Sequence, residues 1–312
     1  MRPKAIALQP DFPPSAALDT LVETLRDRHG DSIAAVLLYG SCLRSGDLFD
    51  GIVDLYLVVD DYRSFYDSKV QAFANRLLAP NVFYLEIPAA EHTFCTKYAV
   101  VSTADFSRGV SWRWFHSYIW ARFAQPTVIA WCRDDASRQI VVAAQATAVR
   151  TFLNRVLPRL PAAGSVQDIW QRGLRMTFAA ELRSEKAERP AELAAAAVDY
   201  YSAATRLAAT SLSFKLLIEG KGADALYECE APRLSRIVAR FAWPARQVQG
   251  KLLSILRLVK ALFTFDNGLD YIAWKLHRHS GQEVEIPDRV RRRPLIFIWG
   301  FCWQLYRRGL IR

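Results

Sequence analysis

The hydrophobic positions of the first 135 residues follow two spacings in alternation. Helical spacing over residues 16–29, after a capping Ser15 and before Gly30, predicts a helix, and residues 62–78 and 103–123 predict two more. Short apolar runs rich in β-branched and aromatic residues predict five buried strands, at residues 33–38, 53–59, 82–87, 98–101 and 127–131. The alternation predicts an α/β domain with a mixed sheet and helices.

From residue 136 onward the pattern is helical, and no strand is predicted. Helical periodicity covers four segments, at residues 136–156, 166–188, 191–209 and 246–262. Pro158, Pro161 and Gly164 predict a linker between the two halves. We therefore expect an α/β domain over residues 1–157, a mainly α-helical domain over residues 158–288 and a separate tail over residues 289–312.

Charge is concentrated at one end of the chain. The 312 residues include 52% hydrophobic and 23% charged residues, which is typical of a globular protein, and 41 Lys and Arg against 31 Asp and Glu leave a net charge of +10. Seven arginines and no acidic residue lie in residues 289–312. Because the rest of the chain is nearly balanced, a basic nucleic-acid groove is not expected.

The basic tail carries an apolar stretch at residues 295–306. As a helix it would be about 18 Å long, too short to cross a hydrocarbon core of about 30 Å. Trp299, Trp303 and Tyr306 would share one face, which favours a helix lying in the plane of an anionic membrane surface. The alternative is a core helix that closes the helical domain.

The cysteine pattern and the N-terminus bear on the compartment. Five widely spaced cysteines form no C-x-x-C pair, so a zinc site or a disulfide framework is not expected. The first residues lack the apolar run of a signal peptide. We expect a cytoplasmic protein, peripheral on the inner face of the cell membrane.

The segment most informative about chemistry is residues 37–61. Gly40 and Ser41 follow one predicted strand directly, and Asp54 lies on the next. A small turn lets backbone N–H groups approach a triphosphate, and a carboxylate on the neighbouring strand would hold the Mg²⁺ that bridges its phosphates. The alternative is a strand, a glycine turn and a strand that carries one surface aspartate.

This layout resembles the polymerase-β-like nucleotidyltransferase superfamily, whose motif joins a Gly-Gly or Gly-Ser turn to an Asp-hydrophobic-acid strand. Gly40, Ser41 and Asp54 match, whereas Tyr56 stands at the position of the second metal carboxylate. The resemblance implies an N-terminal nucleotidyltransferase domain.

A narrower resemblance is to the mitochondrial-type phosphatidate cytidylyltransferases, the translocator-assembly-and-maintenance family, which also lack the second acid. Three segments carry it, over roughly residues 30–190: the turn and strand above, Lys97-Tyr98-Ala99-Val100 followed by residues 118–126, and Leu174-Arg175-Met176 with Glu181 and Arg183. The chain departs from the family pattern at Ala121, where the family has Gly, and at Gln125, where it has Lys.

The resemblance implies that CTP and phosphatidate react, with Mg²⁺, to give CDP-diacylglycerol and pyrophosphate. It assigns Asp54 to the metal, Lys97 and Arg122 to phosphates, and Gly40, Ser41 and Arg44 to the nucleotide. Arg175 and Arg183 are the expected substrate contacts. For Lys97 and Arg122 the alternative is a surface ion pair, or a side chain whose apolar stem is buried and whose charged end reaches solvent.

If a second carboxylate binds the metal, it is expected among the remaining acidic residues. Glu86, on an apolar strand, is our first candidate, with an outward edge position as the alternative, and the others are Asp47, Asp50, Asp60 and Asp61. A phosphate monoester is already mostly ionised near pH 7, so no general base is required. Two other functions remain open: transfer to a soluble or nucleic-acid acceptor, and a catalytically inactive membrane adaptor.

Overall fold

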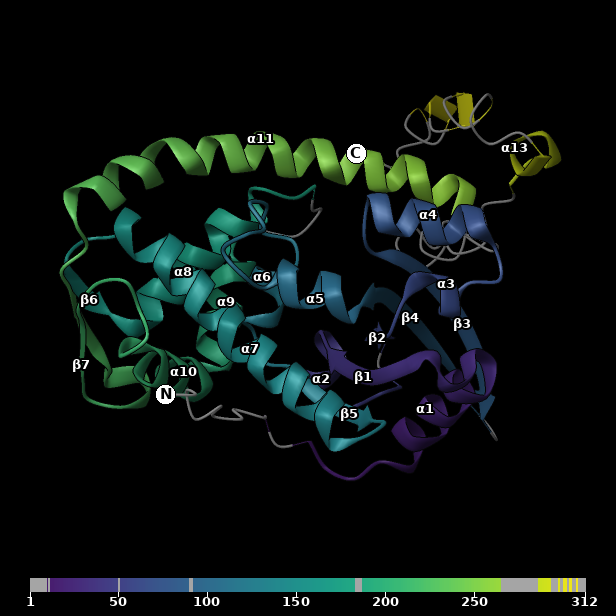
Figure 1. The fold of residues 1–312 in the computed structure, drawn as a ribbon, viewed down its shortest axis with the longest axis horizontal. Coiled ribbons are helices and arrows are strands. Elements are labelled where there is room, and N and C mark those ends of the chain that lie inside the picture. The colour runs from purple at the N-terminus through teal and green to yellow at the C-terminus, as the bar shows by residue number, and fades with distance from the viewer. Residues whose placement is uncertain are drawn as a thin grey trace.

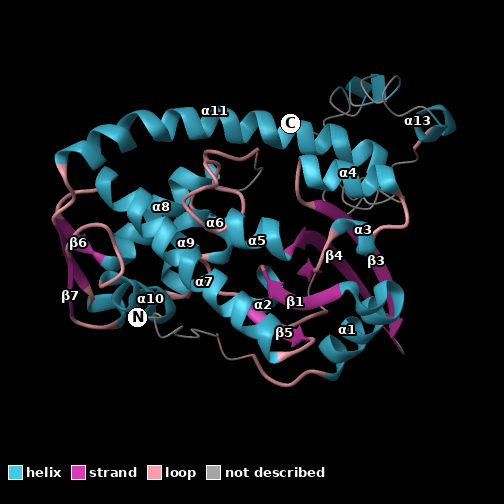
Figure 2. Cartoon of the chain, viewed as in Figure 1, coloured by secondary structure: helices cyan, strands magenta, loops and turns pink. Residues whose placement is uncertain are grey.

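A five-stranded sheet and a group of helices lie side by side, and the long helix α11 (Arg233–Thr264) runs along one side of both (Figures 1 and 2). The computed structural model describes residue 10, residues 12–49, 51–89, 92–182, 187–264 and 286–292, and residues 297, 300, 301, 303, 304 and 307. Most of the predicted tail at 289–312, as well as Asp50 and Arg183, lies outside the described residues.

The large sheet is mixed, as predicted. Its order is β3-β4-β2-β1-β5, with bounds β1 Ile33–Tyr39, β2 Ile52–Val59, β3 Asn81–Ala89, β4 His92–Ser102 and β5 Val128–Cys132. Strands β2 and β4 are parallel, whereas β1 is antiparallel to both β2 and β5, and β3 is antiparallel to β4. The α/β character of the N-terminal half is thereby confirmed.

Each face of this sheet is covered by helices, because successive strand residues point to opposite sides and both sets are apolar. One face packs on α1 (Ala16–His29), α3 (Tyr62–Phe65) and α4 (Lys69–Leu77). The other packs on α5 (Thr103–Gly109), α6 (Trp120–Phe123) and α7 (Asp135–Val156). Ser15 caps α1 as predicted, its Oγ accepting the N–H of Leu18.

Two predicted helices are each divided in the structure. Residues 62–78 form α3 and α4, because Ser68 adopts an extended backbone and caps α4 by accepting the N–H of Gln71. Residues 103–123 form α5 and α6, separated by an irregular segment. Arg155 on α7 holds that segment by donating to the carbonyls of Trp112, Trp114 and Phe115.

The second half is mainly helical, but the prediction that it has no strands was wrong. It contains α8 (Val166–Phe178), α9 (Arg189–Ala196), α10 (Val198–Ala209) and α13 (Asp288–Arg292), with a small antiparallel sheet of order β6-β8-β7. The strands are β6 Ala163–Ser165, β7 Leu216–Glu219 and β8 Leu226–Cys229, each too short to show an alternating pattern.

The proline-rich segment predicted as a linker is fixed to this small sheet. Tyr227 donates its hydroxyl to the carbonyl of Pro161 (2.9 Å), and Cys229 donates its N–H to the carbonyl of Ala162 (2.7 Å). One hydrophobic core runs from Ala35 on β1 to Trp243 on α11 and crosses the predicted boundary at residue 157. The helical half therefore packs directly on the sheet that carries the predicted site.

Candidate functional site

Asp54 lies in a row of side chains that crosses four strands on the face covered by α5 to α7. In register with Asp54 are Tyr39 on β1, Lys97 on β4 and, beyond Lys97, Tyr84 on β3. Lys97 Nζ lies 2.8 Å from Asp54 Oδ1, and the two side chains are 31% and 20% exposed. The parallel pairing of β2 with β4 thus makes a partly accessible ion pair of two predicted site residues.

The glycine turn packs directly against this carboxylate. Gly40 has φ 92°, a conformation that L side chains rarely adopt, and it begins the short helix α2 (Ser41–Ser45). A Cβ on Gly40 would lie 2.9 Å from the Cβ of Asp54 and closer still to Oδ2. Glycine is required here both by the backbone angle and by space, so the two halves of the sequence motif meet in the fold.

Position 56, where the superfamily motif has its second metal carboxylate, carries a neutral phenol. The Tyr56 side chain is fully buried, and its hydroxyl accepts a hydrogen bond of 3.0 Å from Nη1 of Arg122 on α6. Burial raises the pKa of Tyr56 well above its ordinary value, which keeps the hydroxyl protonated. A cation therefore contacts the position at which the superfamily places an acid.

Arg122 is surrounded by aromatic rings and one carboxylate. Its Cζ lies 4.4 Å from the ring centroid of Tyr118 and 5.6 Å from that of Tyr39, and its Nη2 lies 3.7 Å from Glu181 Oε2. Burial disfavours its charge, but the neighbouring hydroxyls and Glu181 keep the pKa of Arg122 above its ordinary value. Arg122 is therefore a fixed cation beside Tyr39, which lies in register with Asp54.

A second arginine approaches the same ring from α11. Arg257 Cζ lies 4.1 Å from the ring centroid of Tyr118. Although burial raises the pKa of the Tyr118 hydroxyl, Arg122 and Arg257 lower it, and the net shift is downward. The series Arg257, Tyr118, Arg122 and Tyr39 thus connects α11 to the row that contains Asp54.

The other predicted contacts are less closely tied to Asp54. Ser41 and Arg44 lie exposed on α2, next to the glycine turn, and Arg175 lies exposed on α8. Gln125, at the family lysine position, donates its amide back to the carbonyl of Ala121 (3.0 Å). Arg183 lies outside the described residues, so its predicted role is not placed.

The structure does not bring Glu86 and Asp54 together. Glu86 is exposed on β3, with β4 between it and Asp54, and it accepts a hydrogen bond from Tyr84 (2.7 Å). The alternative candidates have other partners: Asp60 pairs with Arg133, Asp61 caps α3, and Asp47 accepts the N–H of Phe49.

Of the candidate acids that the structure describes, Asp54 is the one that lies against the glycine turn. Across the parts of the chain that the structure describes, no group of three or more His, Cys, Asp and Glu side chains could hold a metal ion. Mg²⁺ is commonly bound through one or two carboxylates, with substrate phosphates and water completing its shell. A single carboxylate such as Asp54 would fit a Mg²⁺ ion only if phosphate oxygens and water supplied the rest of its shell.

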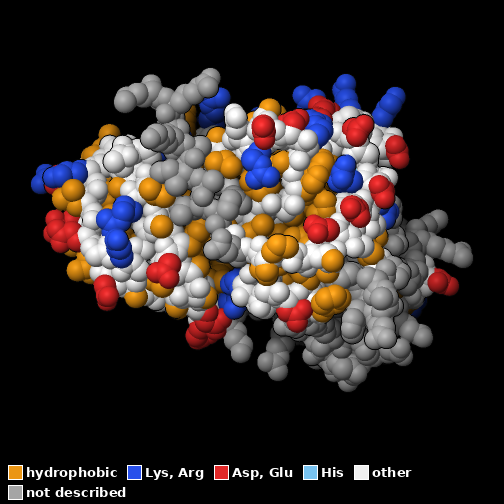
Figure 3. Space-filling view, turned by 90° about the horizontal axis from the view of Figure 1, so that it is seen from below, with side chains coloured by type: hydrophobic (Ala, Val, Ile, Leu, Met, Phe, Trp, Pro, Cys, Tyr) orange, Lys and Arg blue, Asp and Glu red, His pale blue; other side chains and the backbone are white. Residues whose placement is uncertain are grey.

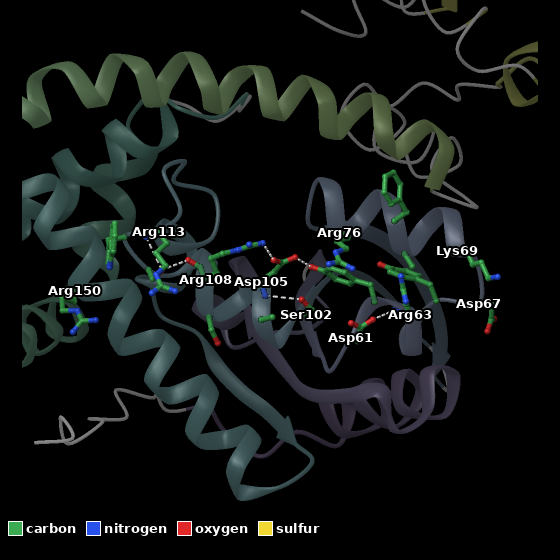
Figure 4. Close-up of a pocket in the computed structure, with 18 residues that line it drawn as sticks. Asp61, Arg63, Asp67, Lys69, Arg76, Ser102, Asp105, Arg108, Arg113 and Arg150 are labelled. Atoms are coloured by element: carbon green, nitrogen blue, oxygen red, sulfur yellow. Dashed lines mark hydrogen bonds and ion pairs between the residues drawn. The ribbon is translucent and has the colours of Figure 1, made fainter.

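A groove of about 1270 Å³ lies at the other end of strands β2 and β4, where β4 ends at Ser102 and Asp61 follows β2 (Figure 4). Cations outnumber acids on its walls: Arg63, Lys69, Arg76, Arg108, Arg113 and Arg150 against Asp61, Asp67 and Asp105. Sequence reasoning missed this groove, because its residues come from four helices (α3, α4, α5 and α7) and from irregular segments, without a recognisable spacing.

The carboxylate at the centre of this groove has protein partners. Asp105 accepts the hydroxyl of Tyr62 (2.9 Å) and pairs with Arg108 (2.5 Å), as the dashed lines in Figure 4 show. Its side chain is only 9% exposed. These contacts tie α5 to α3, so Asp105 has a structural role in the wall of the groove.

Comparison with protein-family models and with curated proteins finds no match to the chain. Among the described residues, no helix has both the length and the apolar character needed to cross a membrane.

Proposed function

We propose that the chain is a nucleotidyltransferase that uses CTP and Mg²⁺ to convert phosphatidate into CDP-diacylglycerol and pyrophosphate. The observation that carries the proposal is the contact of the Gly40 turn with Asp54, which is paired across the sheet with Lys97. This contact joins the small turn, the carboxylate and a cation at one place, as the sequence motif requires. The choice of CTP as the nucleotide and phosphatidate as the acceptor rests on the motif resemblance.

In the proposed reaction a phosphate oxygen of phosphatidate attacks the α-phosphorus of CTP. A new P–O bond forms, the bond between the α-phosphorus and the bridging oxygen breaks, and pyrophosphate leaves with the bonding electrons. The attacking phosphate is already mostly ionised, because its second pKa is about 6, so no side chain has to remove a proton. The chain must align two anions and neutralise their charge.

The described residues can supply that neutralisation. Mg²⁺ held by Asp54 would offset the charge of the triphosphate. Lys97, whose ammonium already lies beside Asp54, would contact a phosphate oxygen, and Ser41 with Arg44 would lie along the triphosphate next to the turn. Arg122 would orient Tyr39 and Tyr56 and add positive charge behind Asp54.

The test is an assay of the purified chain with CTP, Mg²⁺ and phosphatidate in mixed micelles. We expect CDP-diacylglycerol to form, and Asp54→Ala to reduce its rate by at least about 100-fold. Equal product from Asp54→Ala would show that Asp54 is not the catalytic carboxylate. If product forms with a soluble phosphate monoester or an RNA end but not with phosphatidate, the chain is a nucleotidyltransferase with a different acceptor.

A catalytically inactive adaptor is the second candidate. The neutral Tyr56 and the turned-back Gln125 favour it, since Tyr56 replaces an acid of the superfamily motif and Gln125 replaces a lysine of the narrower family pattern. An inactive chain would form no product from any of these acceptors. It would also fail to bind CTP more tightly when Mg²⁺ is present.

A further inference from the structure

Helix α11 has two opposite faces, and among the described residues one of them packs on the body of the protein. The inner face contains Ala239, Trp243, Arg246 and Gly250, all buried and spaced by three or four residues. A Cβ on Gly250 would overlap the carbonyl oxygen of Ala180, so the helix lies directly against the end of α8. This face fixes the helix along the side of the molecule (Figure 1).

Two polar anchors on the inner face hold α11 near its midpoint. Trp243 donates its indole N–H to the carbonyl of Arg155 (2.9 Å), and Arg246 donates Nε–H to the carbonyl of Phe115 (2.7 Å). Nearer its C-terminal end, Arg257 donates to the carbonyl of Ala79 (3.1 Å), and Lys260 donates to that of Pro80 (3.0 Å). The opposite face of the helix must therefore point away from the body of the protein.

That outer face is an exposed apolar stripe. Large hydrophobic side chains recur on it at intervals of three, four and seven residues over more than twenty residues: Leu234 (72% exposed), Val238 (56%), Phe241 (72%), Val248 (71%), Leu252 (54%) and Ile255 (48%). Soluble surfaces rarely expose a contiguous apolar patch of this length unless it binds something.

The charge of the same helix restricts what the stripe can bind. Residues 233–264 contain seven Lys and Arg and no Asp or Glu. Arg233, Arg240 and Lys251 are exposed beside the stripe. By contrast, the face of the molecule turned away from α11 shows Lys and Arg mixed with Asp and Glu (Figure 3).

We infer that the outer face of α11, which we call the α11 stripe, docks on an anionic phospholipid bilayer with the helix lying in the membrane plane. An apolar face flanked by cations and free of acids suits insertion at the headgroup level of acidic lipids. A second copy of the chain would bring another set of the exposed cations Arg233, Arg240 and Lys251 toward the same stripe with no acid on the helix to pair them, which favours the bilayer over a dimer.

The α11 stripe is made of other residues than the basic tail at residues 289–312, and its proposal does not depend on the proposed reaction. It also has a structural consequence for the site. Arg257, on the inner side of α11, contacts Tyr118, which contacts Arg122. The helix that lies on the bilayer therefore also contacts the cluster beside Asp54.

The test is co-sedimentation of the full chain with vesicles that contain no phosphatidate and no nucleotide. Wild type should bind vesicles of phosphatidylcholine mixed with phosphatidylglycerol and bind pure phosphatidylcholine weakly. The triple variant Leu234→Gln, Phe241→Gln, Val248→Gln should lose about tenfold or more in affinity for the mixed vesicles. Its tail is unchanged, so the loss is specific to the stripe.

The matched control is Ile140→Gln with Leu207→Gln, on α7 and α10. These side chains are also exposed (39% and 37%), but α10 lies on the side of the molecule away from α11 (Figure 1), and the control should bind like wild type. Equal vesicle binding by the triple variant and wild type would overturn the inference. The inference would also be overturned if light scattering showed that wild type is a dimer and the triple variant is a monomer. The α11 stripe would then bind a second copy of the chain.

Discussion

Two carboxylates at opposite ends of the central strands show what separates a candidate site from a structural contact. Asp54 pairs with Lys97 across two strands, its side chain is 20% exposed, and the glycine turn lies against it. Asp105 pairs with Arg108 one turn further along the same helix and also accepts the hydroxyl of Tyr62. The partners of Asp105 join α5 to α3.

The contrast between Asp54 and Asp105 shows that a carboxylate beside a pocket is not by itself a reactive group. The groove near Asp105 is open and rich in cations, yet that carboxylate is 9% exposed and held by two side chains. Asp54 lies outside that groove, but a turn that only glycine can form makes room for it. Substitutions at the Asp54 end should therefore change activity, whereas substitutions at Asp105 should change stability.

The largest effect at the Asp54 end, apart from loss of the carboxylate, is expected for Gly40→Ala. The new Cβ would displace Asp54, and a displacement of about 1 Å is enough to cost about 100-fold in rate. The matched control is Gly46→Ala, which also has a positive φ (72°) but meets no atom within 4 Å. Steady-state assays should show a loss for Gly40→Ala that greatly exceeds the loss for Gly46→Ala, and equal losses would contradict the proposed contact.

A smaller loss, of about tenfold, is expected for Arg122→Lys, because lysine cannot keep both the hydrogen bond to Tyr56 and the planar contact with Tyr118. The loss should be in kcat more than in KM if Arg122 acts by orienting its neighbours. Circular dichroism must show an intact fold. An unchanged kcat in a folded variant would show that Arg122 does not contribute to the reaction.

Arg257→Met should reduce activity by a few-fold only, since it removes a cation that reaches the site through Tyr118. Lys251→Met, an exposed substitution on the same helix, is the matched control and should leave activity in detergent micelles unchanged. If both variants behave alike, α11 is not coupled to the Arg122 cluster.

The smallest effect on activity is expected for Asp105→Asn. Weakened hydrogen bonds to Tyr62 and Arg108 should lower the free energy of unfolding by about 2 kcal/mol, measured by urea denaturation. Turnover below the melting temperature should match that of wild type. A large loss of turnover in the folded variant would show that the reactive centre lies in the groove beside Asp105 and not at Asp54.

Much of the Asp54 end is predictable from sequence, because it depends on local patterns. Strands β1 and β2, Gly40 and Asp54 follow from short apolar runs and a turn, and the structure places them together. The pairing of Asp54 with Lys97 depends on the parallel register of β2 with β4. Local patterns do not encode that register, so the sequence offered a surface ion pair for Lys97 as an alternative but did not identify Asp54 as its partner.

The features that were missed depend on tertiary contacts. A helical segment was predicted from residue 246, two residues after Pro244, a residue type that ordinarily ends or kinks a helix. In the structure α11 begins at Arg233 and continues through Pro244, held by the anchors of Trp243 and Arg246 on either side. Glu86 was favoured as a metal ligand from its apolar strand alone, and only the strand order shows that β4 separates it from Asp54.

The central claim, that Asp54 holds the metal-bound nucleotide, is tested most directly by calorimetric titration of CTP with and without Mg²⁺. We predict that wild type and Asp105→Asn bind CTP at least about tenfold more tightly with Mg²⁺, and that Asp54→Asn loses this dependence. A Mg²⁺-dependent affinity in Asp54→Asn equal to that of wild type would contradict the claim.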